Sequence, residues 1–338
     1  MRIFYYQAPQ GNFGDDINQW LWEELLPGRW DDEADTLFCG IGTIIGNDMP
    51  AAARICVFSS GIGYRPPPPD LWSGRWTVGA LRGPLTAQVV GRPDLAAADG
   101  ALLLSTLPRL APIPVDDRRD ILFVPHYEAV DEGDWAQACD RAGVRLVDPR
   151  QCAHRVIDDI RRARLVIADS MHAAIVADAM RVPWVAVASS PRINSFKWLD
   201  WTLSLDLPYD PAPLPSISLR SAYHGQAQRI VAEDYRLPRP SRDRALAQYA
   251  LMARRERSGW WRAWKPRIKH HLRVAPSRLN RLAAMGGIVA RWDERQVDRV
   301  AAALAQAARA PACLSGDAIF GRRVDQLQTA LHGLAQRG

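Results

Sequence analysis

The sequence contains few cysteines, few lysines and no long apolar run that is free of charge. The five cysteines are widely spaced without a Cys-x-x-Cys pair, which argues against a disulfide framework and a zinc site. The most apolar stretch, residues 165–188, is interrupted by charged and titratable side chains, so we expect no transmembrane helix. The first residues lack the apolar core of a signal peptide. A cytoplasmic protein fits these absences best.

Motifs for metal binding and for common hydrolases are also missing. The sequence has no His-x-x-His or His-Glu-x-x-His spacing and no carboxylate cluster with metal-ligand spacing, so we predict no protein-bound metal. It also lacks the Gly-x-Ser-x-Gly elbow, which disfavours a hydrolase.

The length of 338 residues predicts two domains. Short β-type runs alternate with helical patterns, and this alternation restarts after the Pro-rich stretch 106–119, which is typical of a linker. We therefore predict α/β domains over residues 1–115 and 116–235, each built on a parallel sheet, with a ligand cleft between them. The last part, residues 236–338, is predicted to be a basic, Trp-containing helical appendage.

Individual elements follow from the same patterns. In the first domain we predict a helix at 16–26 and strands at 2–6, 36–39, 55–59, 76–78 and 101–104. The pattern loosens after residue 207, and helices are predicted again at 241–257, 294–308 and 317–335.

Positive charge is concentrated in one segment. Residues 236–281 contain 14 Lys or Arg and 2 Asp or Glu, whereas the remainder has 29 basic and 35 acidic residues. The segment also contains Trp260, Trp261 and Trp264. Basic side chains beside interfacial aromatics are typical of a membrane surface or of binding to an acidic polymer. The alternative is a solvated helical segment in an arginine-rich protein. Nucleic-acid binding is disfavoured, because the rest of the chain is acidic and no recognition motif is visible.

A polar elbow separates a buried strand from an apolar helix at residues 165–177. Ser170 is a candidate N-cap, and His172 falls in the first helical turn, near the carboxyl edge of the sheet, where α/β folds bind ligands. An imidazole there can act as general acid or base, or bind an anion when protonated. The alternative is a core histidine that is hydrogen-bonded to a carbonyl group.

The segment Gly11-Asn12-Phe13-Gly14-Asp15-Asp16 also follows a strand and opens a helix. Its glycines allow close backbone approach, and a helix N-terminus offers free N–H groups to a ligand. It is neither a Walker A loop nor a G-x-G-x-x-G fingerprint. Asp15 and Asp16 are therefore either ligand-facing carboxylates or simple helix caps.

A third candidate segment, residues 189–201, combines hydrogen-bond donors with aromatic residues. Arg192, Asn194 and Lys197 suit a carboxylate, a phosphate or sugar hydroxyls, and Trp198 is the kind of side chain that packs on sugar rings. The alternative is a surface loop whose aromatic residues pack under the C-terminal helices. His126 and Arg82, each at a predicted strand end, are weaker candidates that could belong only to turns.

In their order and spacing, six motifs of this sequence together resemble those of the polysaccharide pyruvyl transferase family. They are Gly11-Asn12-Phe13-Gly14-Asp15-Asp16, Gly40-Ile41-Gly42, Arg82-Gly83-Pro84, Asp99-Gly100-Ala101-Leu102-Leu103, Met171-His172 with Pro183, and Phe196-Lys197-Trp198-Leu199-Asp200-Trp201. The last motif is most similar to the branch that builds exopolysaccharides such as succinoglycan and xanthan. The resemblance covers residues 1–207.

The resemblance implies two Rossmann-like domains in a GT-B-like arrangement with a C-terminal helical appendage. It implies phosphoenolpyruvate as the donor substrate, no other cofactor, and a glycan acceptor, lipid-linked in our interpretation, that receives a pyruvate ketal. The first domain would face the acceptor and the second the donor. The protein would work in the cytoplasm, and residues 236–281 are expected to bring it to the inner membrane face. The sequence does not decide its oligomeric state.

The resemblance also suggests roles for the candidate residues. We assign catalysis to His172, Asp15 and Asp16. Donor binding is assigned to Ser170, Met171, Arg192, Lys197, Arg82 and His126. Acceptor binding is assigned to Asn12, Asn194 and Trp198.

Two departures from the family pattern stand out. Many members have an arginine two residues before the helix histidine, where this chain has Ser170, so the expected cation must come from elsewhere. Arg192, Arg82 and Lys197 are the replacement candidates. The common Asp-Pro pair is Asp99-Gly100 here.

Two other functions compete with this interpretation. One is a GT-B glycosyltransferase that uses a nucleotide-sugar, because fold and phosphate site would be shared. The other is a non-catalytic protein that binds a membrane or a polyanion through the basic segment.

Overall fold

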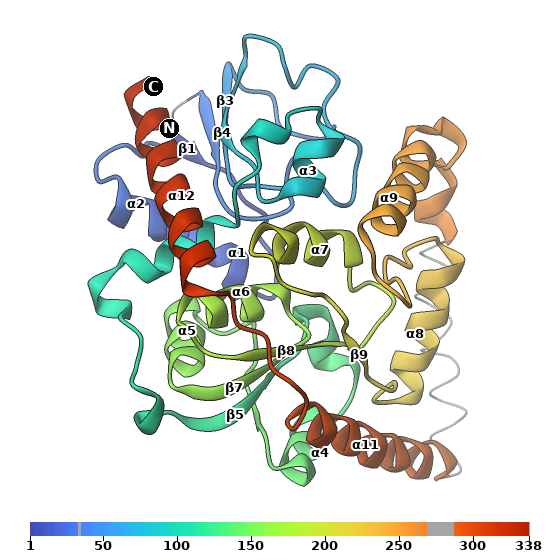
Figure 1. The fold of residues 1–338 in the computed structure, drawn as a ribbon. Coiled ribbons are helices and arrows are strands. Elements are labelled where there is room, and N and C mark those ends of the chain that lie inside the picture. The colour runs from blue at the N-terminus through green and yellow to red at the C-terminus, as the bar shows by residue number, and fades with distance from the viewer. Residues whose placement is uncertain (33–34, 262, 269–286, 338) are drawn as a thin grey trace.

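The computed structural model describes residues 1–32, 35–261, 263–268 and 287–337, and its strands form two parallel sheets (Figure 1). The first sheet has the order β1 (Arg2–Ile3), β2 (Thr36–Cys39), β3 (Arg54–Phe58), β4 (Trp76–Ala80). The second has the order β6 (Arg145–Leu146), β5 (Arg119–Val124), β7 (Ala163–Ala168), β8 (Trp184–Ala188), β9 (Ala212–Pro213). The predicted α/β class with parallel sheets is confirmed.

Side chains of the second sheet alternate between two hydrophobic cores, because successive residues of a strand point to opposite faces. In β7, Val166 and Ala168 join a core shared with the first sheet, whereas Leu165 and Ile167 join a smaller core. The sheet is therefore covered on both faces, which explains why its strands are almost continuously apolar.

The helices connect and cover these strands. In the first half of the chain they are α1 (Phe13–Asp16), η1 (Ile17–Gln19), α2 (Leu21–Leu25), α3 (Pro84–Val89), η2 (Pro93–Leu95), η3 (Gly100–Thr106), η4 (Pro108–Leu110) and η5 (Val115–Asp117). In the second half they are η6 (Tyr127–Glu132), α4 (Trp135–Ala142), α5 (Ala153–Arg161), α6 (Met171–Ala179), α7 (Ser195–Ser204), α8 (Leu219–Ile230), α9 (Arg242–Arg257), α11 (Ile288–Ala307) and α12 (Asp317–Arg337).

Two local predictions were wrong, and one helix was not predicted. The apolar run 101–104 is not a strand but part of the 3-10 helix η3, whose first turn is capped by the Asp99 carboxylate. The single helix predicted at 16–26 is divided into α1, η1 and α2. Helix α8 was not predicted, because none of its residues is fully buried and it has no apolar stripe. A Ser218 capping box starts it instead.

The described helices α9, α11 and α12 contact different parts of the molecule. Helix α9 lies on α3 and α7, α11 covers α4 on the second sheet, and α12 returns to β4 and η3 in the first half. Figure 1 shows this return, with the two termini near each other. The expected appendage is therefore distributed over both sheets.

The basic segment predicted from sequence is only partly described. Residues 262 and 269–281 lie outside the described residues, while Trp260, Trp261 and Trp264 lie within them. Among the helices of the described residues, none is both long enough and apolar enough to cross a membrane.

A buried ion pair joins the two halves of the molecule. Arg82 follows β4 and donates to the Asp200 carboxylate of α7 at 3.0 Å, and both side chains are fully buried. Asp200 also accepts the backbone N–H groups of Leu85 and Thr86 at the start of α3, and the Thr86 hydroxyl. Gly83 is required because a Cβ there would overlap the Asp200 backbone. The Arg82-Gly83-Pro84 motif therefore fixes α7 against the first sheet.

Removing the Asp200 carboxylate should destabilise the folded protein. We expect Asp200→Ala to lower the free energy of unfolding by about 3–5 kcal/mol, because it leaves the Arg82 guanidinium buried without its counter-charge. Urea unfolding monitored by circular dichroism measures the change. The control is Asp94→Ala, which breaks the exposed Arg92–Asp94 pair and should leave the urea midpoint near the wild-type value. Equal midpoints for the two variants would contradict a central role for Asp200.

Candidate active site

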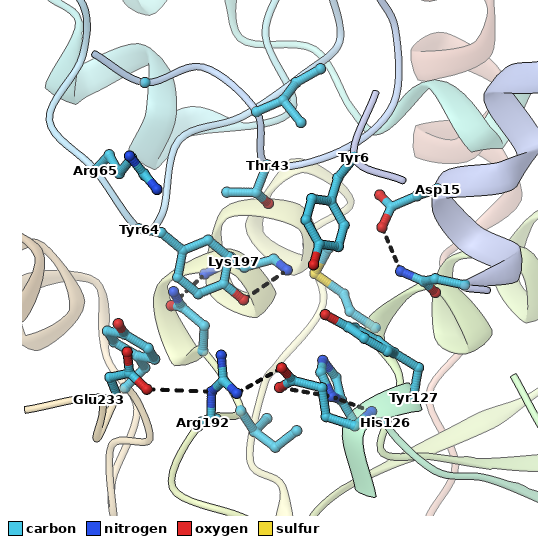
Figure 2. Close-up of a pocket in the computed structure, with 18 of the residues that line it drawn as sticks. Tyr6, Asp15, Thr43, Tyr64, Arg65, His126, Tyr127, Arg192, Lys197 and Glu233 are labelled. Carbon is cyan, nitrogen blue, oxygen red and sulfur yellow. Dashed lines mark hydrogen bonds and ion pairs between the residues drawn. The ribbon is translucent and has the colours of Figure 1, made fainter. Parts of the chain in front are cut away.

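A pocket of about 910 Å³ lies between the two sheets and is lined from both halves of the chain (Figure 2). We call it the central pocket. Helix α6 begins at its wall directly after β7, at the carboxyl edge of the second sheet, where α/β proteins place ligands. All but two of the site residues predicted from sequence line it: Asn12, Asp15, His126, Ser170, Met171, His172, Arg192, Asn194, Lys197 and Trp198.

The two exceptions are Asp16 and Arg82. The Asp16 carboxylate accepts the Asn12 N–H and a Gln19 amide hydrogen, so it stabilises the start of its own helix. The Arg82 guanidinium is fully buried and is bound by Asp200, the Thr43 hydroxyl and a backbone carbonyl group. Neither side chain faces the central pocket, so we do not retain either for direct ligand binding.

The Gly11–Asp16 motif places a carboxylate beside the histidine. A Cβ on Gly14 would overlap the His172 imidazole, so only glycine lets α1 lie directly against α6. Gly11 has φ +87° and lies against the carbonyl oxygen of Arg150, so it also needs to be glycine. This packing brings Asp15 and His172 into one pocket wall.

His172 is a neutral imidazole with an unsatisfied nitrogen. Its side chain is buried, and its Nε2 atom has no hydrogen-bond partner among the described residues. Burial lowers its pKa to about 3, and the positive charges of Lys197 and Arg82 contribute. The residue lines the central pocket, but this nitrogen is itself shielded from solvent. The alternative of a core histidine bonded to a carbonyl group is not what the geometry shows.

Asp15 has a carboxyl group that titrates near neutral pH. Burial raises its pKa to about 7, while Lys197 and a hydrogen bond from the Asn12 side-chain amide oppose the rise. A group with this pKa is suited to take up and release protons at physiological pH.

Lys197 supplies positive charge that no described carboxylate neutralises at ion-pair distance. Its Nζ atom donates to the Tyr64 hydroxyl at 3.2 Å and lies 5.0 Å from the centre of that ring. Arg192 differs, because Glu128 binds it at 2.6 Å and Glu233 lies at 3.9 Å. Lys197 is therefore the better anion ligand of the two.

Asn194 and Trp198 face the pocket but are occupied by structural contacts. The Asn194 side chain caps α7 through the N–H groups of Phe196 and Lys197 and donates to the Gly63 carbonyl. Trp198 is almost fully buried and stacks on Tyr209 with ring centres 5.1 Å apart. Asn194 thus fixes the start of α7 at Lys197, and Trp198 packs in the core, so neither residue exposes much of its side chain to a ligand.

The loop at the end of β5 carries His126. Burial lowers the pKa of this histidine to about 3, and the positive charges of Lys197 and Arg192 contribute. Its backbone N–H donates to Asp169, which also accepts the N–H and hydroxyl of Ser189. Asp169 thus ties together the ends of β5, β7 and β8.

Sequence reasoning missed the tyrosines of the pocket. Tyr6 and Tyr64 point into it from two loops, and Tyr127 points into it from the start of η6 (Figure 2). Tyr64 follows the Gly61-Ile62-Gly63 turn at a strand end, and this glycine-rich turn was the sequence feature that could have indicated a pocket residue there. Gly63 is needed there because a Cβ would press on the Lys197 side chain.

Among the described residues, no group of three or more His, Cys, Asp or Glu side chains could hold a metal ion.

The chain belongs to the polysaccharide pyruvyl transferase family. A family model described as polysaccharide pyruvyl transferase matches residues 49–191. This range runs from β3 to β8 and includes the His172 helix α6. The chain is 36% identical over 340 residues to the succinoglycan biosynthesis protein ExoV of Rhizobium meliloti (strain 1021), covering 99% of this chain and 98% of that protein. No solved structure is significantly similar to this chain. The family resemblance of the six motifs is confirmed.

The raised pKa of Asp15 predicts a pH-dependent gain in stability for Asp15→Asn. The native protein keeps this proton up to about pH 7, whereas the unfolded chain loses it near 3.8. The buried group therefore costs stability increasingly as the pH rises from about 4 to 7, and the full cost is present above 7. Asp15→Asn should raise the free energy of unfolding by about 1 kcal/mol or more at pH 8, and by less at pH 5.

Urea unfolding at the two pH values measures this difference. Asp16→Asn is the control, because that partly exposed neighbour lies outside the pocket and should show a smaller pH dependence. An Asp15→Asn variant that is no more stable at pH 8 than the wild type would show that burial does not disfavour the ionised carboxylate.

Proposed function

We propose that the protein transfers pyruvate from phosphoenolpyruvate to a sugar of an exopolysaccharide as a ketal. The observation that carries the proposal is the convergence of Lys197, His172 and Asp15 in the central pocket. Membership of the polysaccharide pyruvyl transferase family supports the reaction class, and the similarity to a succinoglycan biosynthesis protein supports the kind of acceptor.

The donor has a carboxylate and a phosphate, and the pocket is suited to such a dianion. Lys197 offers an ammonium group without a described ion-pair partner, and the start of α6 offers the backbone N–H of Met171 and the Ser170 hydroxyl, whereas the Ser170 N–H donates to the Val124 carbonyl group. We assign Lys197 as the cation that replaces the arginine expected at position 170. Arg192 and His126 shape the neighbouring wall, where Glu128 matches the charge of Arg192.

The proposed reaction forms two C–O bonds at the central carbon of the donor and breaks its bond to the phosphate oxygen. One sugar hydroxyl proton ends on the methylene carbon, which becomes a methyl group. The second hydroxyl proton leaves with the phosphate. No further cofactor is needed, because the donor carries both the pyruvyl group and its leaving group. The protein has to move protons and stabilise charge at the reacting carbon.

Two residues suit these proton transfers. Asp15, with a pKa of about 7, is our candidate for the base that accepts a proton from the acceptor hydroxyl. His172 is our candidate for the group that transfers a proton to or from the donor. Burial lowers its pKa most and Lys197 lowers it further, so a dianion bound beside Lys197 would oppose the smaller of these two effects.

The acceptor would lie on the other wall of the pocket. Tyr6, Tyr64 and Tyr127 offer aromatic faces of the kind on which sugar rings pack, with Asn12 and Asn194 at the pocket edge. We also propose that the two sheets form Rossmann-like domains in a GT-B-like arrangement. Residues 1–115 would face the acceptor and residues 116–235 the donor.

We further propose that the acceptor is lipid-linked and that the protein works at the cytoplasmic face of the membrane. The basic, tryptophan-containing segment supports this location.

Donor identity separates this function from a glycosyltransferase that uses a nucleotide-sugar. We expect purified protein with a soluble glycan acceptor and phosphoenolpyruvate to release inorganic phosphate, and proton NMR of the product to show a ketal methyl signal. Nucleotide-sugars should yield no nucleoside diphosphate. Release of nucleoside diphosphate, with none of phosphate, would support the glycosyltransferase instead.

The contact between Gly14 and His172 gives a second test of the site. His172→Ala should lower kcat for phosphate release by about 10²–10⁴-fold while the circular dichroism spectrum stays unchanged. Gly14→Ala should also lower kcat strongly, because its methyl group displaces the imidazole. The control is Gly74→Ala, where an added Cβ meets open space and activity should remain near wild type. Near-normal turnover of His172→Ala would remove this residue from the mechanism.

A further inference from the structure

A surface of exposed tryptophans lies beside the central pocket. Trp260 and Trp264 are 65% and 45% exposed, and their ring centres are 6.2 Å apart. Residues four apart lie on the same face of a helix, and residues 259–261 and 263–268 are helical. Large aromatic side chains rarely stay exposed together on a soluble surface unless they contact a partner. We call these residues, with Arg267, the tryptophan surface.

One arginine contacts one of these rings, and three more precede them closely in the sequence. The Arg267 guanidinium lies 5.6 Å from the centre of the Trp264 ring. Arg254, Arg255 and Arg257 are exposed at the end of α9, a few residues before Trp260, and none of the three pairs with a carboxylate of the described residues. The acidic residue among them, Glu256, is bound by Lys265 at 2.7 Å. The excess charge around the tryptophan surface is therefore not compensated within the described chain.

The helical residues 263–268 also border the pocket. Lys265 and Pro266 line the pocket together with Glu256 from α9. Lys265 contacts Glu256 and also Glu233 at 3.7 Å, which anchors the helix to the pocket wall. The tryptophan surface is therefore formed by a segment that also borders the pocket.

We propose that the tryptophan surface docks on an anionic lipid bilayer and thereby presents the pocket opening to the membrane. Tryptophan rings prefer the interface between lipid headgroups and acyl chains, and arginines add attraction to anionic lipids. A soluble polyanion would use the arginines but leave the exposed rings without a partner. A second copy of the chain on this surface would bring like charges together. The proposal deepens the proposed function, because it specifies how a lipid-linked acceptor is reached, but the docking itself needs no catalysis.

Vesicle flotation tests the docking directly. Wild-type protein should float with phosphatidylcholine vesicles that contain about one third phosphatidylglycerol, and less with pure phosphatidylcholine, with binding weakened by salt. Trp260→Gln combined with Trp264→Gln should lower the apparent partition coefficient at least about tenfold. The matched control is Trp72→Gln, a tryptophan that is 47% exposed in the first half of the chain and should not affect flotation.

The outcomes separate the docking from the enzyme function. Phosphate release with a soluble acceptor should be the same in the double variant as in the wild type, since neither tryptophan lines the pocket. The proposal is overturned if wild-type protein does not float, or if the double variant floats as well as the wild type. It is also overturned if the substitutions only change the oligomeric state in light scattering, or only weaken binding to soluble polyphosphate. Loss of phosphate release with intact flotation would instead count against the proposed function.

Discussion

The buried carboxylate of Asp200 fixes the relation between the two sheets on which the central pocket depends. It lies on α7, one turn after Lys197, and binds Arg82 and the start of α3 across the molecule. A charge that is fully removed from water requires such a complete set of partners. Because α7 is held in this way, Lys197 and Asn194 are presented to loops of the first sheet, where they meet Tyr64 and Gly63.

The electrostatics of the pocket follow from this arrangement. Burial disfavours charge on His172 and Asp15, which shifts the pKa of the histidine down to about 3 and that of the aspartic acid up to about 7. Lys197 lies beside them, and no carboxylate of the described residues is at ion-pair distance from it, so this wall offers a positive charge. A small dianion would balance it. In the proposed function, the same surroundings would favour an anionic donor and hold the candidate proton-transfer groups beside it.

The sequence predicted the parts of this protein that depend on local periodicity. The strand and helix around His172 were foreseen because an apolar strand followed by a polar elbow is a local pattern. The Arg82–Asp200 pair spans 118 residues, so no local pattern showed that Arg82 serves the fold rather than a ligand. Helix α8 lacked an apolar stripe, and Tyr64 is brought to the site by a loop whose course depends on tertiary packing.

The central claim is that the turn before α6 and the ammonium group of Lys197 bind the donor within the pocket between the sheets. A crystal structure of the protein with phosphoenolpyruvate bound tests this most directly. The account predicts the phosphate or carboxylate of the donor at hydrogen-bond distance from Lys197 Nζ, with its methylene carbon facing the His172 and Asp15 wall. A donor bound outside this pocket, or within it but away from both Lys197 and the start of α6, would contradict the account.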